Sequence, residues 1–423
     1  MQNFLNKLKI ILEDKSLRKR ILFVLLAFVV FRIFSTIPIP GIDALKLEQF
    51  LTNNQFFGLL NLFSGGGLSN LSIVMLGVGP YITSSIIMQL LTIMVPKLKA
   101  MYHEEGELGR KKFTQYSRLL TVPLALVQGF GLLTLLGRQE ILGSLSFFDQ
   151  ILNLAIVTAG SVLVMWLGEL ISEYGVGNGV SLLIFAGIVA QIPSSISQLA
   201  FTFDISQIPL YIAFIVGAIV IIAGVVFITE AERKIPVTYA KRVRGAKMYG
   251  GVSTYLPLRV NQAGVIPIIF ALSILLFPQM IATFLAGIDN VALQKIASLL
   301  GLFIQNLWLY GIFYFLLVFV FTYFYTAVTF DPQSLSTNLQ KNGAFIPGIR
   351  PGPSTAVHIS KILNRITLAG AVFLGAMAVL PIIMQSVTGV QALAIGGTAL
   401  LIVVSVVIDL IKKLDAQISM REY

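Results

Sequence analysis

Residues 56–91 form an uncharged stretch that a single membrane helix cannot accommodate. They read FFGLLNLFSGGGLSNLSIVMLGVGPYITSSIIMQLL and hold 36 positions without one charged side chain. About 20 apolar residues suffice to cross ~30 Å of hydrocarbon, so the stretch is too long for one span. Glycines at 65–67 and the run Gly77–Pro80 interrupt it, and both residue types weaken or break helices. The stretch therefore predicts a membrane segment built from two parts.

Composition places the chain in a membrane. Of the 423 residues, 56% are hydrophobic and 12% are charged, whereas soluble proteins carry about 25% charged residues. The mean hydropathy of +0.88 predicts a polytopic membrane protein. The absence of cysteine excludes disulfides, thiolate nucleophiles and Cys-ligated metals. No cleavable signal sequence is expected, because the first 20 residues are charged and lack a short apolar core.

Hydrophobic runs long enough to span the bilayer recur along the whole chain. The ten predicted spans are 21–37, 73–95, 117–137, 150–170, 179–196, 210–229, 264–286, 306–329, 366–386 and 391–410. An even number of spans places both termini on the same side of the membrane. Two groups of five spans, 1–205 and 206–423, are predicted, and in an odd-numbered repeat the second half inserts inverted.

The distribution of basic residues predicts which side of the membrane the termini and loops face. Nearly all of the 30 lysines and arginines lie in the N-terminus, the C-terminal tail and the loops 96–118, 230–262 and 330–365. The opposite loops hold only Lys46, Arg138 and Lys295. Because cytoplasmic loops are enriched in basic residues, both termini and the three basic loops are predicted to be cytoplasmic.

Groups that would support catalysis or ion coupling are scarce. The two histidines lie in loops, and neither a phosphate-binding loop nor an HExxH motif is present. The charged residues closest to the spans sit toward span ends; they are Arg32, Glu169, Glu230 and Asp409. Ion-coupled transporters usually keep such groups near the bilayer centre. A small-solute secondary transporter and an intramembrane enzyme remain as alternatives, which this pattern disfavours.

Two of the basic loops are longer than a connector requires. Residues 230–262 and 330–365 mix basic residues with aromatic residues and prolines. Basic cytoplasmic loops are ordinary in membrane proteins, so most of these lysines need no further role. The length and the prolines nevertheless predict that both loops protrude and dock an acidic partner, either protein or RNA.

Several long motifs resemble one family. They are SIVMLGVGPYITSSIIMQLL at 72–91, WLGELISEYGVGNGVSLLI at 166–184, YAKR at 239–242, LPLRVN at 256–261 with AGVIP at 263–267, and GAFIPGIRPG at 343–352. Along essentially its whole length the chain resembles the SecY/Sec61-alpha family, which forms the channel of the Sec protein translocase. The resemblance implies a channel, not an enzyme, that passes unfolded secretory polypeptides across the membrane and releases transmembrane segments sideways into lipid.

The resemblance also implies an architecture. The expected fold is an all-α polytopic protein with ten helices in two pseudo-symmetric inverted halves and a re-entrant plug helix. The resemblance also implies a pore ring of aliphatic side chains, whose positions correspond to Val78, Ile82, Val180, Ile184, Ile269 and Ile402. The spacing independently supports the pairs Val78/Ile82 and Val180/Ile184, because residues four positions apart share one helix face.

Two further elements follow from the same family match. The plug is expected near residues 57–70, and its named members are Leu60, Phe63, Ser64, Gly65, Gly66 and Gly67. A lateral gate is expected between the second and third spans and the seventh and eighth. Small or weakly polar residues suit such a helix contact, and the candidates are Thr83, Ser84, Ile86, Gln89, Ser273 and Phe277.

The resemblance finally implies partners rather than cofactors. Arg350 lies in a tight Pro-Gly turn and is expected to engage the SecA ATPase or the ribosome, since a guanidinium contacts carboxylates and phosphates in bidentate fashion. Supporting charges are expected at Lys241, Arg242, Arg244 and Lys247. The small subunits SecE and SecG, signal sequences, unfolded preproteins and membrane lipid complete the expected partners, in a bacterial plasma membrane with both termini cytoplasmic. No cofactor or metal is expected.

Overall fold

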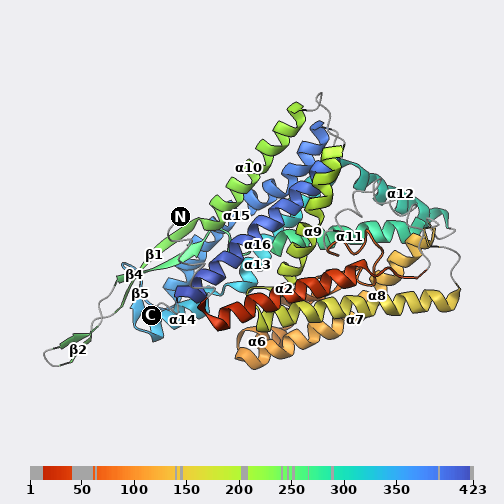
Figure 1. Cartoon of the computed structure of the whole chain (residues 1–423). Helices are drawn as coiled ribbons and strands as arrows, with labels where there is room; N and C mark the ends of the chain where they lie inside the picture. Colours follow the sequence, from red (N-terminus) through yellow and green to blue (C-terminus); the bar gives the residue numbers. More distant parts are fainter. Residues whose placement is uncertain are drawn as a thin grey trace.

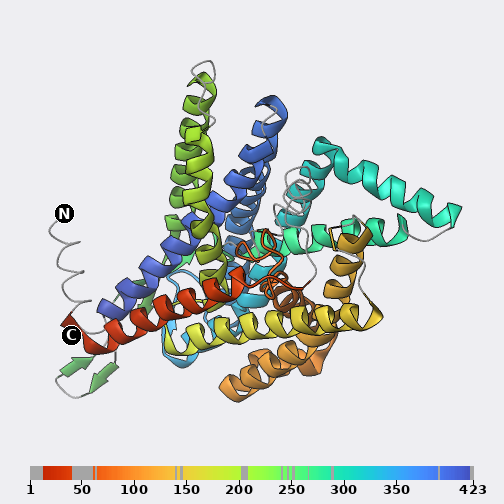
Figure 2. The ribbon, with the colours of Figure 1, turned by 45° about the vertical axis from the view of Figure 1, so that its right-hand side comes forward.

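The computed structural model shows a bundle of long helices with a small group of strands at one end (Figure 1). It describes residues 13–40, 61, 64–138, 141–142, 146–201, 208–239, 242–244, 247–249, 253–264, 266–286, 290–388 and 391–419. Figures 1 and 2 agree that the strands, the start of α2 and the end of α16 lie at one end of the molecule, and that α12 lies at the other.

The helices of the first half are α2 (Lys15–Thr36), α5 (Gly79–Met94), α6 (Pro96–His103), α7 (Gly106–Arg138), α8 (Phe147–Tyr174) and α9 (Gly179–Phe201). Those of the second half are α10 (Ile208–Glu230), α11 (Ile266–Ala286), α12 (Val291–Gln305), α13 (Leu307–Thr329), α14 (Pro332–Lys341), α15 (Pro353–Thr388) and α16 (Gln391–Ser419). The strands are β1 (Glu232–Tyr239), β2 (Arg242–Arg244), β3 (Lys247–Tyr249), β4 (Ser253–Arg259) and β5 (Ala344–Phe345).

Each of the ten predicted ranges contains a helix, so a mostly helical chain is confirmed. Among the described residues, four helical segments are long and apolar enough to cross a membrane, namely 106–137, 147–174, 307–341 and 353–384. The pair 79–94 and 96–102 passes the same test only together, and it is bent by 114°. The number of spans and the inverted repeat stay predictions.

The second predicted span begins later than its hydropathy suggests. We expected a helix from about residue 73, but residues 73–78 form turns and α5 begins at Gly79. The reason is local chemistry: Gly77 has φ +54°, a left-handed conformation that favours glycine. Pro80 then occupies the first helical turn, where its missing N–H costs nothing.

The expectation of an all-α chain is wrong for the loops that precede α11 and α15. β1 pairs with β4 antiparallel, and β5 adds to the other edge of β1, so that the strand order is β4-β1-β5. β2 and β3 form a separate two-stranded hairpin. Ile235 and Val237 of β1 are buried while Lys234 and Pro236 are exposed, and this alternation is the period of a half-buried strand.

The main hydrophobic core joins both halves of the chain. It contains buried residues of α2, α5, α8 and α9 together with residues of α10, α11, α13, α15 and α16. Contacts between the halves concentrate in two places: α9 packs against α16, and α5 and α7 pack against α11. The division at 205/206 stays a prediction, but the structure shows where the two predicted parts meet.

Helix α8 supports the non-helical residues 73–78. The Ser161 hydroxyl donates a hydrogen bond to the Gly77 carbonyl at 3.1 Å. At Gly160 the helix approaches so closely that an added Cβ would collide with the Ile73 carbonyl oxygen. The missing side chain therefore sets the distance between α8 and this segment.

We predict that Gly160→Ala lowers the stability of the protein, because the methyl group meets a backbone atom that cannot move aside. Overpacking of this kind costs ~1–3 kcal/mol. The measurement is the midpoint of thermal unfolding in detergent. Gly137→Ala is the matched control, since nothing lies within 4 Å of a Cβ at that helical position. Equal midpoints for the two variants would contradict the prediction.

Candidate functional site

Most residues of the expected pore ring come together in one buried cluster. Val78, Ile82, Ile184, Ile269 and Ile402 all belong to the main core, and each is at most 5% exposed. They come from the N-cap and first turns of α5, from α9, from α11 and from α16. The sixth residue, Val180, is half-buried and packs against the same cluster.

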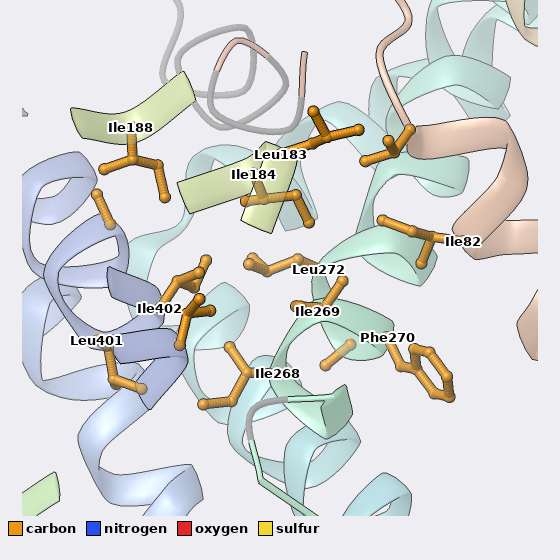
Figure 3. Packing of buried hydrophobic residues seen from close by; sticks show 14 of the residues in the cluster. Ile82, Leu183, Ile184, Ile188, Ile268, Ile269, Phe270, Leu272, Leu401 and Ile402 are labelled. Atoms are coloured by element: carbon orange, nitrogen blue, oxygen red, sulfur yellow. The ribbon is translucent and has the colours of Figure 1, made fainter. Parts of the chain in front are cut away.

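Figure 3 shows how these side chains are oriented. Ile184, Ile269 and Ile402 turn toward a common centre from three different helices, and Ile82 lies beside the helix that carries Ile269. The side chains labelled around them in Figure 3 are aliphatic except for Phe270. An arrangement of this kind offers no hydrogen bond to a polypeptide and no ligand to an ion.

The sequence interpretation missed some neighbours of this cluster. Ile188 follows Ile184 by four residues, and Leu272 follows Ile269 by three; both are buried in the same core and appear beside the ring in Figure 3. Helical spacing was the available signal. It did not single them out, because aliphatic residues at such spacing occur along every span of this chain.

The expected plug lies partly outside the described residues. Leu60 and Phe63 are among those not described, whereas Ser64, Gly65, Gly66 and Gly67 form buried turns. The turns are held by backbone hydrogen bonds, with the Gly66 N–H donating to Asn61 and the Ser72 N–H to Gly67. Residues 64–78 form turns rather than a helix, apart from the bridge at Ser72, whereas Asn61, the described residue before them, is helical.

The glycines of this segment allow close packing as well as unusual backbone angles. Gly65 and Gly66 have φ of +65° and +85°, a region that disfavours other residues. An added Cβ on Gly187 of α9 would collide with Gly65 Cα, and one on Gly65 would collide with the Phe31 ring of α2. The segment is therefore seated directly on the backbone of α9, the helix that carries Ile184.

The polar side chains of the expected lateral gate donate hydrogen bonds within their own half, while Gln89 Oε1 is buried without a hydrogen-bond partner among the described residues. Thr83 donates to the Gly79 carbonyl of α5, and Ser84 donates to the Ser117 carbonyl of α7. On the opposite side, Ser273 donates to the Ile269 carbonyl of its own helix α11. Gln89 donates to Ser85, one turn earlier.

The contact between α11 and the helices α5 and α7 is therefore apolar. Ile86 of α5 belongs to the main core, which also includes residues of α11. Among the described side chains, no hydrogen bond or ion pair joins α5 or α7 to α11. The side chain of Phe277 lies outside the described residues.

The two long basic loops form one structural unit. Thr238 and Tyr239 of β1 pair with Phe345 and Ala344 of β5, which joins the loop before α11 to the segment before α15. Beneath this sheet lies a separate small core, made of Ile235, Val237, Leu258, Ala344, Ile346 and Ile359. The sequence interpretation treated the loops separately, because pairing between distant segments leaves no local signal.

Arg350 lies on an exposed, well-supported turn between β5 and α15. Gly348 and Gly352 flank it with φ of +79° and +102°. The Ser336 hydroxyl of α14 donates to the Gly352 carbonyl, and Thr355 donates to the Arg350 carbonyl at 3.0 Å. The backbone is thus held while the guanidinium remains exposed.

The remaining expected docking residues lie elsewhere. Arg242 is on β2, Arg244 ends β2, and Lys247 begins β3, opposite Arg244 in the hairpin register. Lys241 is outside the described residues. Figure 1 shows this hairpin at the tip furthest from the helices, beyond β1 and β4. Its backbone is therefore separate from the sheet that β5, the strand before Arg350, joins.

The carboxylates nearest the spans are held in ion pairs. Glu169 accepts from Arg118 at 2.6 Å, Glu230 lies 2.9 Å from Lys412 Nζ, and Asp409 pairs with Lys413. In the part of the chain that the structure describes, no group of three or more His, Asp and Glu side chains is placed to hold a metal. These carboxylates contribute to structure rather than to an open polar site.

Solved structures share this fold. A protein-conducting channel superposes with a TM-score of 0.65 at 19% identity, and the match covers 95% of this chain and 93% of the channel. Sec61 in a canine ribosome-channel complex from the endoplasmic reticulum superposes with a TM-score of 0.60 at 18% identity, covering 95% of this chain and 93% of Sec61. The fold and the buried aliphatic ring thus define a multi-pass helical membrane protein with the architecture of a protein-conducting channel.

Sequence comparison gives the particular family. The SecY family model matches residues 72–411. Protein translocase subunit SecY of Mycobacterium leprae is 41% identical over 97% of both chains. The chain therefore belongs to the SecY family, and it is a multi-pass protein of the bacterial plasma membrane.

We predict that Gly187→Ala raises the ion conductance of the resting protein. The added methyl group meets the backbone of Gly65 and forces the segment 64–67 away from α9. The measurement is the current through the purified, unliganded complex in planar bilayers. Gly301→Ala in α12 is the control, because nothing lies within 4 Å of a Cβ there. If Gly187→Ala conducts no more than this control, the segment does not seal the channel.

Proposed function

We propose that this chain is the protein-conducting channel of a Sec-type translocase. It passes unfolded secretory polypeptides across the membrane and releases transmembrane segments sideways into lipid. The observation that carries the proposal is the buried aliphatic ring of Val78, Ile82, Ile184, Ile269 and Ile402, which unites helices of both halves. Val180 is the sixth member.

The chemistry of the ring suits this role. An apolar constriction expels water and thereby blocks ions without any charged gate. Aliphatic side chains also form no hydrogen bonds, so they do not retain a passing polypeptide of any sequence. In the packed state the ring closes on itself, which corresponds to a resting channel.

Residues 64–67 are proposed as part of the plug. Leu60 and Phe63, which lie outside the described residues, are proposed as further members. The support is the position of residues 64–67 on α9, whose residue Ile184 belongs to the ring. In this contact the Gly65 backbone meets the Gly187 backbone, and Gly66 lies beside the Gln191 side chain of α9. A seat of this kind excludes ions while remaining weak enough for a translocating chain to displace it.

The lateral gate is proposed at the contact of α5 and α7 with α11. Two features support it: the contact is apolar, and the hydrogen bonds of Thr83, Ser84 and Ser273 stay within their own half. The halves can therefore part here without breaking the hydrogen bonds of these three side chains, and each buried group left unpaired would cost ~1–3 kcal/mol. The apolar surface that this separation exposes would be covered by lipid. Ile86, Gln89 and Phe277 complete the proposed gate residues.

The sheet β4-β1-β5 and the Arg350 turn are proposed as a docking platform for the SecA ATPase or the ribosome. Support comes from the exposed guanidinium on a braced turn and from the ribosome-bound state of the structurally similar Sec61. The hairpin that carries Lys241, Arg242, Arg244 and Lys247 contributes a second, more distant contact. SecE, SecG and signal sequences are proposed as further partners, with ten spans and both termini on the cytoplasmic side.

The transporter alternative loses further support from the ion pairs. Glu169, Glu230 and Asp409 are the carboxylates closest to the spans, and each is paired with a cation. A coupling carboxylate must exchange a proton or an ion during transport, and a carboxylate held in an ion pair toward the end of a predicted span is poorly placed for that. The proposal includes no catalytic step.

We predict that a secretory chain arrested midway crosslinks to a photoreactive amino acid at Ile184. The side chain lies in the ring, so a polypeptide in the pore must pass it. The control is the same amino acid at Ile219 of α10, which is 58% exposed on the outer surface of the bundle. Labelling from Ile219 but not from Ile184 would refute the pore assignment.

We predict that Arg350→Glu impairs partner-driven transport without reducing the stability of the protein. Loss of one charge-assisted contact of ~1.5–3 kcal/mol lowers partner affinity by roughly ten- to a hundredfold. The measurements are SecA binding and ATP-dependent transport into vesicles. Lys361→Glu is the matched control, because Lys361 is an exposed basic residue of α15 away from the turn. Transport equal to that of the control would contradict the assignment of Arg350 to the docking site.

A further inference from the structure

Helix α12 has two apolar sides, and only one of them packs against the rest of the protein. It runs along α11 and reaches α13 at its end. The side turned to the protein carries Ala297, which is buried, and Leu293 and Leu300, which are half-buried. The Phe303 ring contacts the Phe313 ring of α13 edge-on, with centroids 5.4 Å apart. This contact fixes the angle at which α12 meets α13.

A second apolar side of α12 has no cover among the described residues. Ile296, Leu299 and Leu302 recur every third position and therefore share one helix face. Their exposed fractions are 47%, 66% and 65%. Val291 at the start of the helix is 73% exposed. A stripe of large aliphatic side chains exposed to this extent marks a contact with another apolar phase.

Exposed apolar residues of α13 follow the stripe closely in the chain. Only Asn306 separates the two helices, and α13 forms the apolar part of a segment that qualifies as a membrane span. The first turns of α13 expose Trp308, Leu309 and Ile312. Tryptophan concentrates where a span meets the aqueous boundary. The helix α12 therefore lies at the level where α13 enters the membrane, at the end of the molecule away from the strands (Figures 1 and 2).

The polar residues of α12 fit the same location. Lys295 is exposed, and four residues before Leu299 it lies on the same face of the helix as the stripe. A lysine stem lies along apolar surface while its ammonium reaches outward, here to the phosphates of lipid headgroups. Ser298 is exposed, and its hydroxyl donates to the Lys295 carbonyl. Exposed aliphatic residues, an exposed polar side and a basic residue on one helix are typical of an interfacial helix.

We propose that α12 rests its exposed apolar side on the lipid surface, at the membrane boundary opposite the β strands. The occupant of this face is the boundary between headgroups and acyl chains of the bilayer. Because α12 links α11 to α13, the lipid contact tethers the end of α11 to the membrane surface. This inference goes beyond the channel function and does not depend on it.

The test uses the absence of native cysteine. Single variants Ile296→Cys, Leu299→Cys and Leu302→Cys are labelled with a nitroxide in the full-length chain. The assembled complex is placed in nanodiscs of phosphatidylethanolamine and phosphatidylglycerol. Power saturation then compares the accessibility of each label to oxygen, which partitions into lipid, and to a water-soluble nickel chelate. Ser298→Cys on the polar side is the matched control.

The expected result is high oxygen access and several-fold lower nickel access at the three stripe positions than at Ser298→Cys. Nickel access equal to that of the control would place the stripe in water and overturn the proposal. Exclusion of both reagents would show that a protein covers the stripe, which also overturns it. Three positions are used so that one poorly assembled variant does not decide the outcome.

Discussion

The structure depends on keeping the non-helical residues 64–78 hydrogen-bonded inside the protein. Irregular backbone is tolerated at membrane depth only where protein or an aqueous cavity satisfies it. Here each turn closes on the next: the Met75 N–H donates to Ser72 and the Gly77 N–H donates to Val74, at 2.9 and 2.8 Å. The Ile39 N–H donates to Leu71, and the Ile73 N–H to Ile37. This ladder ties the segment to the chain that leaves α2.

The same constraint explains the glycines on both sides of the segment. Turns this tight need left-handed angles at Gly65, Gly66 and Gly77, and the flanking helices must come close enough to cover the peptide groups. Gly160 and Gly187 provide that approach on α8 and α9. Because the turns delay the start of α5, Val78 and Ile82 fall at its beginning, where they join the ring of aliphatic residues from the other helices.

Polar contacts join helices within each half, whereas the contact between the halves is apolar. Within the halves, hydrogen bonds and ion pairs such as Ser84 to Ser117 and Arg118 to Glu169 join neighbouring helices. At the junction of α5 and α7 with α11, the contact is made by apolar side chains such as Ile86. Polar bonds hold a fixed helix pair more specifically than apolar packing does. The helix pairs inside each half are therefore better specified than this junction.

The sequence by itself determined the membrane class, the approximate helix ranges and the interruption at Gly65–Gly67 and Gly77–Pro80, because hydropathy and helix breaking are local properties. It failed on β1, although Ile235 and Val237 alternate with exposed residues, since one short alternating run inside a basic loop is a weak signal. It also left α12 unassigned, because its 15 residues are too few for a span. Only the tertiary structure decided which aliphatic residues converge, that β5 pairs with β1, and that Gly187 meets Gly65. The physical reason is that periodicity defines the apolar side of an element, whereas its neighbour is chosen by packing between distant segments.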